Sequence, residues 1–157
     1  MNANHISRLL WLALAVASGT QVVQVNFSGG LVESIPCTIN NNDVIRLDFG
    51  NAVIIRNLDG VNYSKPINYQ IVCDAPGSVR LTLKGAETLF DDAAIQTNVA
   101  GLGIRINVGG QPFMLNTPIV VNPASLPALV AVPVADPGNT PETGVFNATA
   151  TLMADYQ

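Results

Sequence analysis

Side chains able to do acid–base or nucleophilic chemistry are scarce in this chain of 157 residues. Asp91 and Asp92 form the clearest carboxylate pair, and paired carboxylates are what a glycosidase uses. Adjacent residues of an extended segment point in opposite directions, however, so a solvated acidic turn is the better interpretation. The glycine pairs at 29–30 and 109–110 and the Gly-x-Gly at 101–103 match no phosphate-binding motif. These residues predict neither a catalytic site nor a nucleotide cofactor.

The start of the chain has the layout of a secretory signal peptide. Residues 1–8 are short and polar, and residues 9–17 are apolar, a run well below the roughly 20 residues that span a bilayer. Ala15 and Ala17 supply the small residues that signal peptidase reads. We expect cleavage after Ala17, with cleavage after Gly19 and a buried N-terminal helix as the alternatives.

Cleavage would change the chemistry available to the mature chain. It removes His5 and Trp11, the one histidine and the one tryptophan. A Ser-His-Asp or Cys-His mechanism is then impossible. It also removes Arg8, so the net charge becomes one unit more negative than the −4 of the full chain. An acidic chain without a basic cluster predicts no nucleic-acid partner, and no second apolar run predicts insertion into a membrane.

Two cysteines, Cys37 and Cys73, remain after cleavage. A small even number of cysteines in an exported protein favours a disulfide, which here would close a loop of about 36 residues and contribute roughly 4 kcal/mol. Two thiolates without histidine or a Cys-x-x-Cys pair do not make a zinc site. No metal or other cofactor is predicted.

Alternation of apolar and polar residues predicts an all-β chain with a sizeable core. Hydrophobic residues make up 48% of the chain and charged residues 11%, with 10 prolines and 13 glycines to punctuate the runs. This pattern is typical of a single β-sandwich or barrel. The expected strands cover residues 67–73, 79–84 and 102–108, then 44–49, 53–56 and 129–134, where Pro133 favours an edge or a bulge. A short helical turn is expected at 86–94.

Both ends of the mature chain carry long alternating segments. The N-terminal segment predicts a strand with one apolar face made of Val23, Val25, Phe27, Gly29 and Leu31. The C-terminal segment has an apolar face made of Gly144, Phe146, Ala148, Ala150, Leu152, Ala154 and Tyr156. A strand that runs to the end of the chain needs a neighbour to hold it.

Carbohydrate binding is not favoured by the aromatic residues. The mature chain lacks tryptophan, and of Tyr63, Tyr69 and Tyr156 the last two fall on inward strand faces. Glycosylation sequons at Asn26, Asn62 and Asn147 are short enough to arise by chance.

Several segments together resemble the minor pilins of chaperone–usher pili, especially the tip adaptors of P-pilus and type 1 systems. The segments are Ile-Pro-Cys-Thr-Ile-Asn-Asn at 35–41, Leu-Asp-Phe-Gly-Asn at 47–51 and Tyr-Gln-Ile-Val-Cys at 69–73. The most specific part of the resemblance is Gly144, which opens the last fourteen residues, with Tyr156 as the penultimate residue. An inward glycine in the N-terminal extension, here Gly29, also fits.

The resemblance implies an incomplete immunoglobulin-like sandwich that lacks its last strand. Residues 1–17 would be the signal peptide, 18–33 a donor-strand extension and 34–157 the pilin domain. A periplasmic chaperone would fill the open groove, and at the outer-membrane usher the extension of a neighbouring subunit would replace it. The protein would then be a non-enzymatic fimbrial subunit at the cell surface that contributes to adhesion.

The resemblance also assigns roles to residues. The donor face would be Val23, Val25, Phe27, Gly29 and Leu31. The strand that borders the groove and meets the chaperone would present Gly144, Phe146, Ala148, Ala150, Leu152, Ala154, Tyr156 and Gln157, the last through its carboxylate. The disulfide Cys37–Cys73 would join the first and third strands.

The alternative is a complete, secreted β-sandwich that binds a ligand or acts as an adhesin domain. Within the pilin class, major subunit, tip adaptor and terminator stay open, although the motif at 35–41 favours an adaptor.

Overall fold

The computed structural model describes residues 23–31 and 35–157. The chain divides into two units, Met1–Val32 and Glu33–Gln157. The predicted signal peptide lies outside the described residues. In the first unit, residues 23–31 form no hydrogen-bonded strand within this single chain, so the strand expected there stays a prediction. Extended backbone becomes a strand only where a neighbouring strand completes its ladder of hydrogen bonds.

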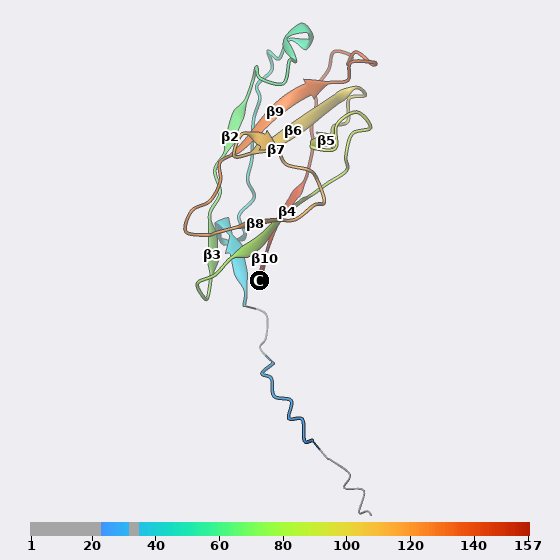
Figure 1. The fold of residues 1–157 in the computed structure, drawn as a ribbon. Coiled ribbons are helices and arrows are strands. Elements are labelled where there is room, and N and C mark those ends of the chain that lie inside the picture. The colour runs from blue at the N-terminus through green and yellow to red at the C-terminus, as the bar shows by residue number, and fades with distance from the viewer. Residues whose placement is uncertain (1–22, 32–34) are drawn as a thin grey trace, which may run out of the picture. The chain divides into compact units, whose positions relative to one another are not determined.

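The second unit is built from short strands and two 3₁₀ turns, with no α-helix within residues 35–157 (Figure 1). None of its helical turns is long and apolar enough to cross a membrane. The strands are β1 (Cys37–Ile39), β2 (Lys65–Ile67), β3 (Ile71–Cys73), β4 (Val79–Lys84), β5 (Ala94–Gln96), β6 (Leu102–Val108), β7 (Gln111–Pro112), β8 (Ile119–Val121), β9 (Leu129–Ala135) and β10 (Thr151–Tyr156). The 3₁₀ turns are η1 (Asn40–Asn42) and η2 (Ile55–Asn57).

All the strand pairs are antiparallel, as expected for a sandwich whose connections are turns and loops. One sheet has the order β10-β4-β8, and a second has the order β2-β9-β6-β5 with β7 paired to β6. A third, two-stranded sheet joins β1 to β3. The C-terminal strand β10 is therefore at an edge of its sheet: β4 pairs with one side, and no strand of the described residues is hydrogen-bonded to the other.

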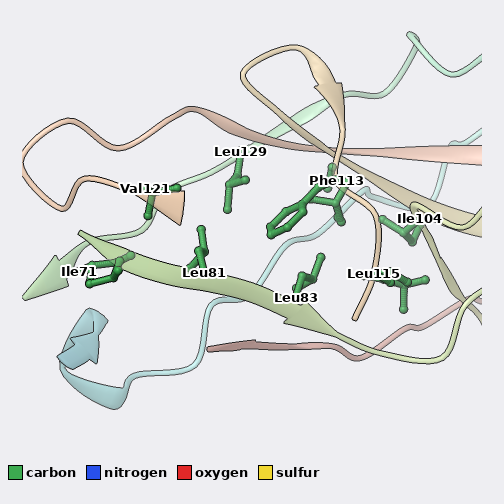
Figure 2. Close-up of a cluster of buried hydrophobic side chains, with 12 residues drawn as sticks. Ile71, Leu81, Leu83, Ile104, Phe113, Leu115, Val121 and Leu129 are labelled. Carbon is green, nitrogen blue, oxygen red and sulfur yellow. The ribbon is translucent and has the colours of Figure 1, made fainter. Parts of the chain in front are cut away.

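The core lies between the sheets and is almost wholly aliphatic (Figure 2). Val79, Leu81 and Leu83 alternate along β4 and are buried, which is the period-2 pattern read from the sequence. Among the described residues, Phe113, directly after β7, has the largest fully buried side chain, and it faces them across the core. A smaller cluster of Ala94, Val132 and Val134, with Phe90, is separate from this core.

Three sequence-based expectations differ from the structure. Residues 44–49 and 53–56 are not strands, because no neighbouring strand pairs with them; η2 occupies part of the second run. Residues 86–93 form a loop without a helix, closed by a hydrogen bond from Ala94 N–H, at the start of β5, to Asp91 O. The strand β9 lies between β2 and β6, whereas Pro133 predicted an edge or a bulge. Pro133 lies beyond Ala131, the last residue of β9 paired with β2, so its missing N–H does not interrupt the β2–β9 ladder.

Candidate functional site

A long hollow of about 1240 Å³ runs along the open edge of the second unit. Its floor is apolar and includes Leu83, Ile95, Ile104 and Leu129 from the core. Two stretches of chain run along it, residues 43–54 and residues 144–156, and all but a few of their residues line it. We call the first the free wall and the second the anchored wall, because they differ in how they are held.

The anchored wall is hydrogen-bonded along much of its length. Its lower part is β10, which pairs residue by residue with β4 from Thr151–Lys84 to Tyr156–Val79. Higher up, Asn98 binds the wall three times: its backbone N–H donates to Asn147 O at 3.2 Å, its Nδ2 donates to Val145 O at 3.1 Å, and its Oδ1 accepts from Asn147 N–H at 2.6 Å. Backbone groups alternate in direction along an extended chain, so those of the intervening Phe146 point away from Asn98.

The free wall has almost no backbone hydrogen bonds within the described chain. Between Val44 and Val53 the one backbone group with a partner is Gly50 N–H, which donates to the Asp48 side chain of the same wall. The inward side chains Ile45, Leu47 and Phe49 line the hollow. The wall thus faces the hollow with apolar side chains and unpaired backbone, held mainly at its two ends.

The first end is a turn of three consecutive asparagines in the left-handed region. Asn40, Asn41 and Asn42 have φ of 47°, 51° and 67°. Asparagine tolerates this region better than other residues with a Cβ, because its short side chain can hydrogen-bond locally. Here Asn40 Oδ1 accepts from Gln70 N–H at 2.7 Å, and Asn40 O accepts from Asp43 N–H at 2.9 Å. The turn redirects the chain from β1 into the free wall.

The second end is held by Tyr63, whose hydroxyl accepts from Ile54 N–H at 3.1 Å. Tyr63 itself has a left-handed φ of 64°. It follows a turn in which Asp59 Oδ1 accepts from the backbone N–H groups of Val61 and Asn62 at 2.9 and 2.8 Å. The hydrogen bonds from Asn62 and Val61 favour the ionised carboxylate and hold the pKa of Asp59 below its usual range.

The two walls touch through one aromatic pair. The rings of Phe49 and Phe146 have centroids 6.0 Å apart and an interplanar angle of 41°. Both side chains are half-buried, and both pack against the apolar core. The pair therefore crosses the hollow between two segments that share no backbone hydrogen bond in the described chain.

Six of the residues expected to border a groove line the hollow, and their role in binding a strand stays a prediction. Gly144, Phe146, Ala148, Ala150, Leu152 and Ala154 line the hollow. Tyr156 packs at the end of the core instead, and its hydroxyl donates to Pro76 O at 2.9 Å. Gln157 N–H donates to Ser78 O at 3.2 Å.

The expected donor residues lie in the first unit and are exposed to solvent. The exposed fraction of Val23, Val25, Phe27 and Leu31 runs from 64% to 105%. A Cβ added at Gly29 would meet no atom within 4 Å. The disulfide joins Cys37 of β1 to Cys73 of β3, whose Cα atoms are directly opposite each other in the ladder.

Comparisons with known proteins agree on a family. The model of the fimbrial protein family matches residues 25–157. The chain belongs to this family. It is 34% identical to the fimbrial-like protein YfcQ of Escherichia coli strain K12, over 95% of this chain and 96% of that protein.

Two solved pilin structures share the fold. The P pilus rod subunit PapA matches with a TM-score of 0.60 and 23% identity, over 85% of this chain and 100% of that one. The P pilus adaptor subunit PapF matches with a TM-score of 0.56 and 25% identity, over 78% of this chain and 96% of that one. This fimbrial protein is thus an all-β, immunoglobulin-like structural subunit of a surface pilus, and that family consists of structural proteins.

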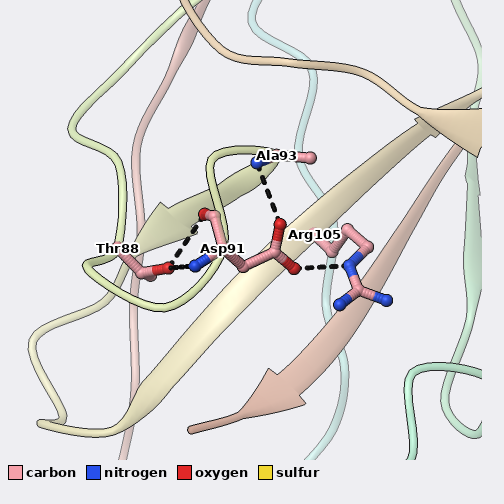
Figure 3. Close-up of polar contacts among 4 residues, drawn as sticks. All are labelled: Thr88, Asp91, Ala93 and Arg105. Atoms are coloured by element: carbon pink, nitrogen blue, oxygen red, sulfur yellow. Dashed lines mark hydrogen bonds and ion pairs between the residues drawn. The ribbon is translucent and has the colours of Figure 1, made fainter.

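Asp91, one of the two adjacent carboxylates, has a structural role in this fimbrial subunit (Figure 3). Asp91 accepts from the Nε of Arg105, and also from Ala93 N–H at 3.0 Å, while Thr88 Oγ1 accepts from Asp91 N–H at 3.1 Å. Asp91 is therefore ion-paired inside a loop beside β6, where the sequence predicted a solvated turn. The described residues contain no group of three or more His, Cys, Asp or Glu side chains that could hold a metal.

The three tyrosines hold loops together. Besides the hydrogen bonds of Tyr63 and Tyr156, the hydroxyl of Tyr69 donates to Pro127 O at 2.7 Å, and burial raises its pKa. Their hydroxyls are used inside the domain, which agrees with the inward faces predicted for Tyr69 and Tyr156.

Sequence reasoning missed the residues that shape the free wall and its contact with the anchored wall. Asn98 lies 47 and 49 residues from the residues its side chain binds, and Tyr63 binds Ile54 from beyond a turn, so no strand pattern marks either residue. The alternation of Ile45, Leu47 and Phe49 could have indicated the free wall, because a strand pattern that finds no partner strand leaves a free backbone edge.

Proposed function

We propose that this fimbrial subunit is assembled by strand donation through the groove between its two walls. A periplasmic chaperone first supplies a strand, and at the outer-membrane usher the N-terminal extension of a neighbouring subunit replaces it. The observation that carries the proposal is the pair of unpaired backbone edges that face each other across an apolar floor.

A polypeptide strand suits this groove better than a small molecule does. Small-molecule pockets usually measure about 300–1,000 Å³ and are not bordered by two free backbone edges. A strand between the walls could hydrogen-bond to both, and its alternate side chains could reach the core. Left empty, such edges are a hazard for aggregation, which a chaperone would suppress.

The extension has the composition that a donor strand needs. The four apolar donor side chains are largely in water, and burying each would contribute about 1.5–3 kcal/mol. We assign Val23, Val25, Phe27, Gly29 and Leu31 as the donor face. The acceptor strand is the anchored wall, with alternate residues from Gly144 to Tyr156, and the carboxylate of Gln157 binds basic chaperone residues.

The strand-donation proposal also assigns a role to each segment of the chain. Residues 1–17 direct export to the periplasm and are removed, residues 18–33 are the donor extension, and residues 34–157 are the pilin domain without its last strand. The motif at 35–41 favours a minor or adaptor position in the pilus, from which the subunit contributes to adhesion.

Supplying the missing strand from the same chain tests the proposal. We delete residues 18–33 and append residues 20–32 after Gln157 through a short flexible linker. The expected product is a soluble monomer without chaperone, because tethering raises the effective concentration to about the millimolar range. Its midpoint of thermal unfolding should exceed that of the chain without the appended strand by at least about 10 °C.

The matched control carries the same appended strand with serine in place of its four apolar donor residues. It should behave as the chain without the strand, because main-chain pairing alone leaves the core uncovered. If all three chains are monomeric and unfold at the same temperature, the sandwich is already complete and the strand-donation proposal fails.

A further inference from the structure

The contact between Phe49 and Phe146 lies where an incoming strand would have to pass. Each ring belongs to a different wall, and both walls line the same hollow. A strand inserted between two others separates their backbones by about twice 4.8 Å, and its inward side chains need the space between them. The two rings fill part of that space while the groove is empty.

The two rings are not held equally. Phe146 lies between Val145 and Asn147, which Asn98 binds through three hydrogen bonds. Phe49 lies in the free wall, between the turn at Asn40–Asn42 and the hydrogen bond from Ile54 to Tyr63. Movement that separates the rings is therefore expected in the free wall, with Phe146 as the fixed partner.

We propose that Phe49 and Phe146 form an aromatic latch across the groove that sets the rate at which a strand enters. The proposal rests on the strand-donation function. Tilted aromatic pairs add stabilisation beyond that of the buried area, and here the pair adds it to the closed arrangement of the walls. Entry of a strand requires this contact to break, after which the rings can pack against the inserted side chains.

Replacing either phenylalanine by leucine keeps an apolar side chain in the groove but removes the ring contact. The probe is a synthetic peptide of residues 20–32 with a terminal fluorophore, added to the oxidised, signal-free chain at micromolar concentration. Fluorescence anisotropy follows the rate and the extent of binding, and circular dichroism checks that each variant is folded. The variants are Phe49→Leu, Phe146→Leu and the double variant.

The matched control is Phe90→Leu. Phe90 is also half-buried, but it packs on the separate cluster of Ala94, Val132 and Val134 and does not line the groove. It reports any gain in rate that comes from general loss of stability.

With a latch, each single variant binds the peptide about two- to tenfold faster than the unaltered chain, a range set by the strength of an aromatic pair. The double variant is about as fast as either single variant, because one substitution already opens the latch. The control keeps the original rate. Equal rates in all the chains, or an equal gain in the control, would overturn the latch and leave strand donation standing. Absence of peptide binding to the unaltered chain would overturn both.

Discussion

The two walls of the groove are alike in sequence and unlike in how they are held. Both turn alternate apolar residues toward the same floor. The anchored wall pairs with β4 and is bound by Asn98, whereas the free wall has hydrogen bonds mainly at its ends. Alternation therefore indicates which face of a segment is buried, and the available neighbours determine whether that segment becomes a strand.

Under the proposed strand-donation function, this difference between the walls has a mechanical consequence. A groove with two rigid walls would resist entry, and one with two loose walls would lose its register. One anchored wall can provide the template while the other moves aside. Local stability of this uneven kind is typical of binding elements.

The largest expected effect comes from removing the disulfide, because it fixes β1, from which the free wall starts. Replacing Cys37 and Cys73 together by serine should lower the free energy of unfolding by about 4 kcal/mol, as expected for a loop of this length. Urea unfolding of the oxidised chain and the double variant measures the loss. A loss below about 1 kcal/mol would mean that the root of the free wall is held by other contacts.

Truncating Leu47 in the free wall and Leu81 next to the anchored wall compares how much each wall contributes to the free energy of unfolding. Leu81 is fully buried beside Ala154 of the anchored wall, whereas Leu47 of the free wall is 37% exposed. Leu81→Ala should cost about 3 kcal/mol and Leu47→Ala less than about 1 kcal/mol, since a partly exposed site leaves little cavity. Equal losses in urea unfolding would contradict the distinction between the walls.

Smaller, local effects are expected from the side chains that hold each wall. Asn98→Ala removes two side-chain hydrogen bonds from the anchored wall, and Tyr63→Phe removes one from the end of the free wall. Each hydrogen bond contributes about 1 kcal/mol. Hydrogen exchange should accelerate at Asn147 in the first variant and at Ile54 in the second. Acceleration at both amides in either variant would show that the walls move together.

The smallest effect is the response of the free wall to acid. Because the pKa of Asp59 is lowered in the folded state, its contribution to stability is present above the ordinary pKa of 3.8 and is lost as the pH falls through the lower folded value. Exchange at Ile54 should therefore accelerate at strongly acidic pH, and Asp59→Asn should weaken this dependence. Asn147, bound by the uncharged Asn98, serves as the internal control. An identical acid response of Ile54 exchange in the variant would show that Asp59 does not cause it.

Much of the fold follows from local patterns. The runs at 79–84 and 102–108 form β4 and β6, because strict alternation buries one face of each strand. The run at 67–73 was predicted as one strand, but β2 ends at Ile67, β3 begins at Ile71, and residues 68–70 belong to neither strand. The acidic pair was predicted as a solvated turn because nothing near Asp91 in sequence marks Arg105 as its partner.

The sequence by itself determined the all-β class, the pairing of its two cysteines and the apolar faces at both ends of the chain. These properties depend on residue type and on spacing along one strand, so they can be read locally. The tertiary structure alone decided which alternating run has a partner, that Asn98 and Tyr63 hold the walls, and that Phe49 meets Phe146. Those contacts join separate segments of the chain, and their energies exist only after folding has brought the segments together.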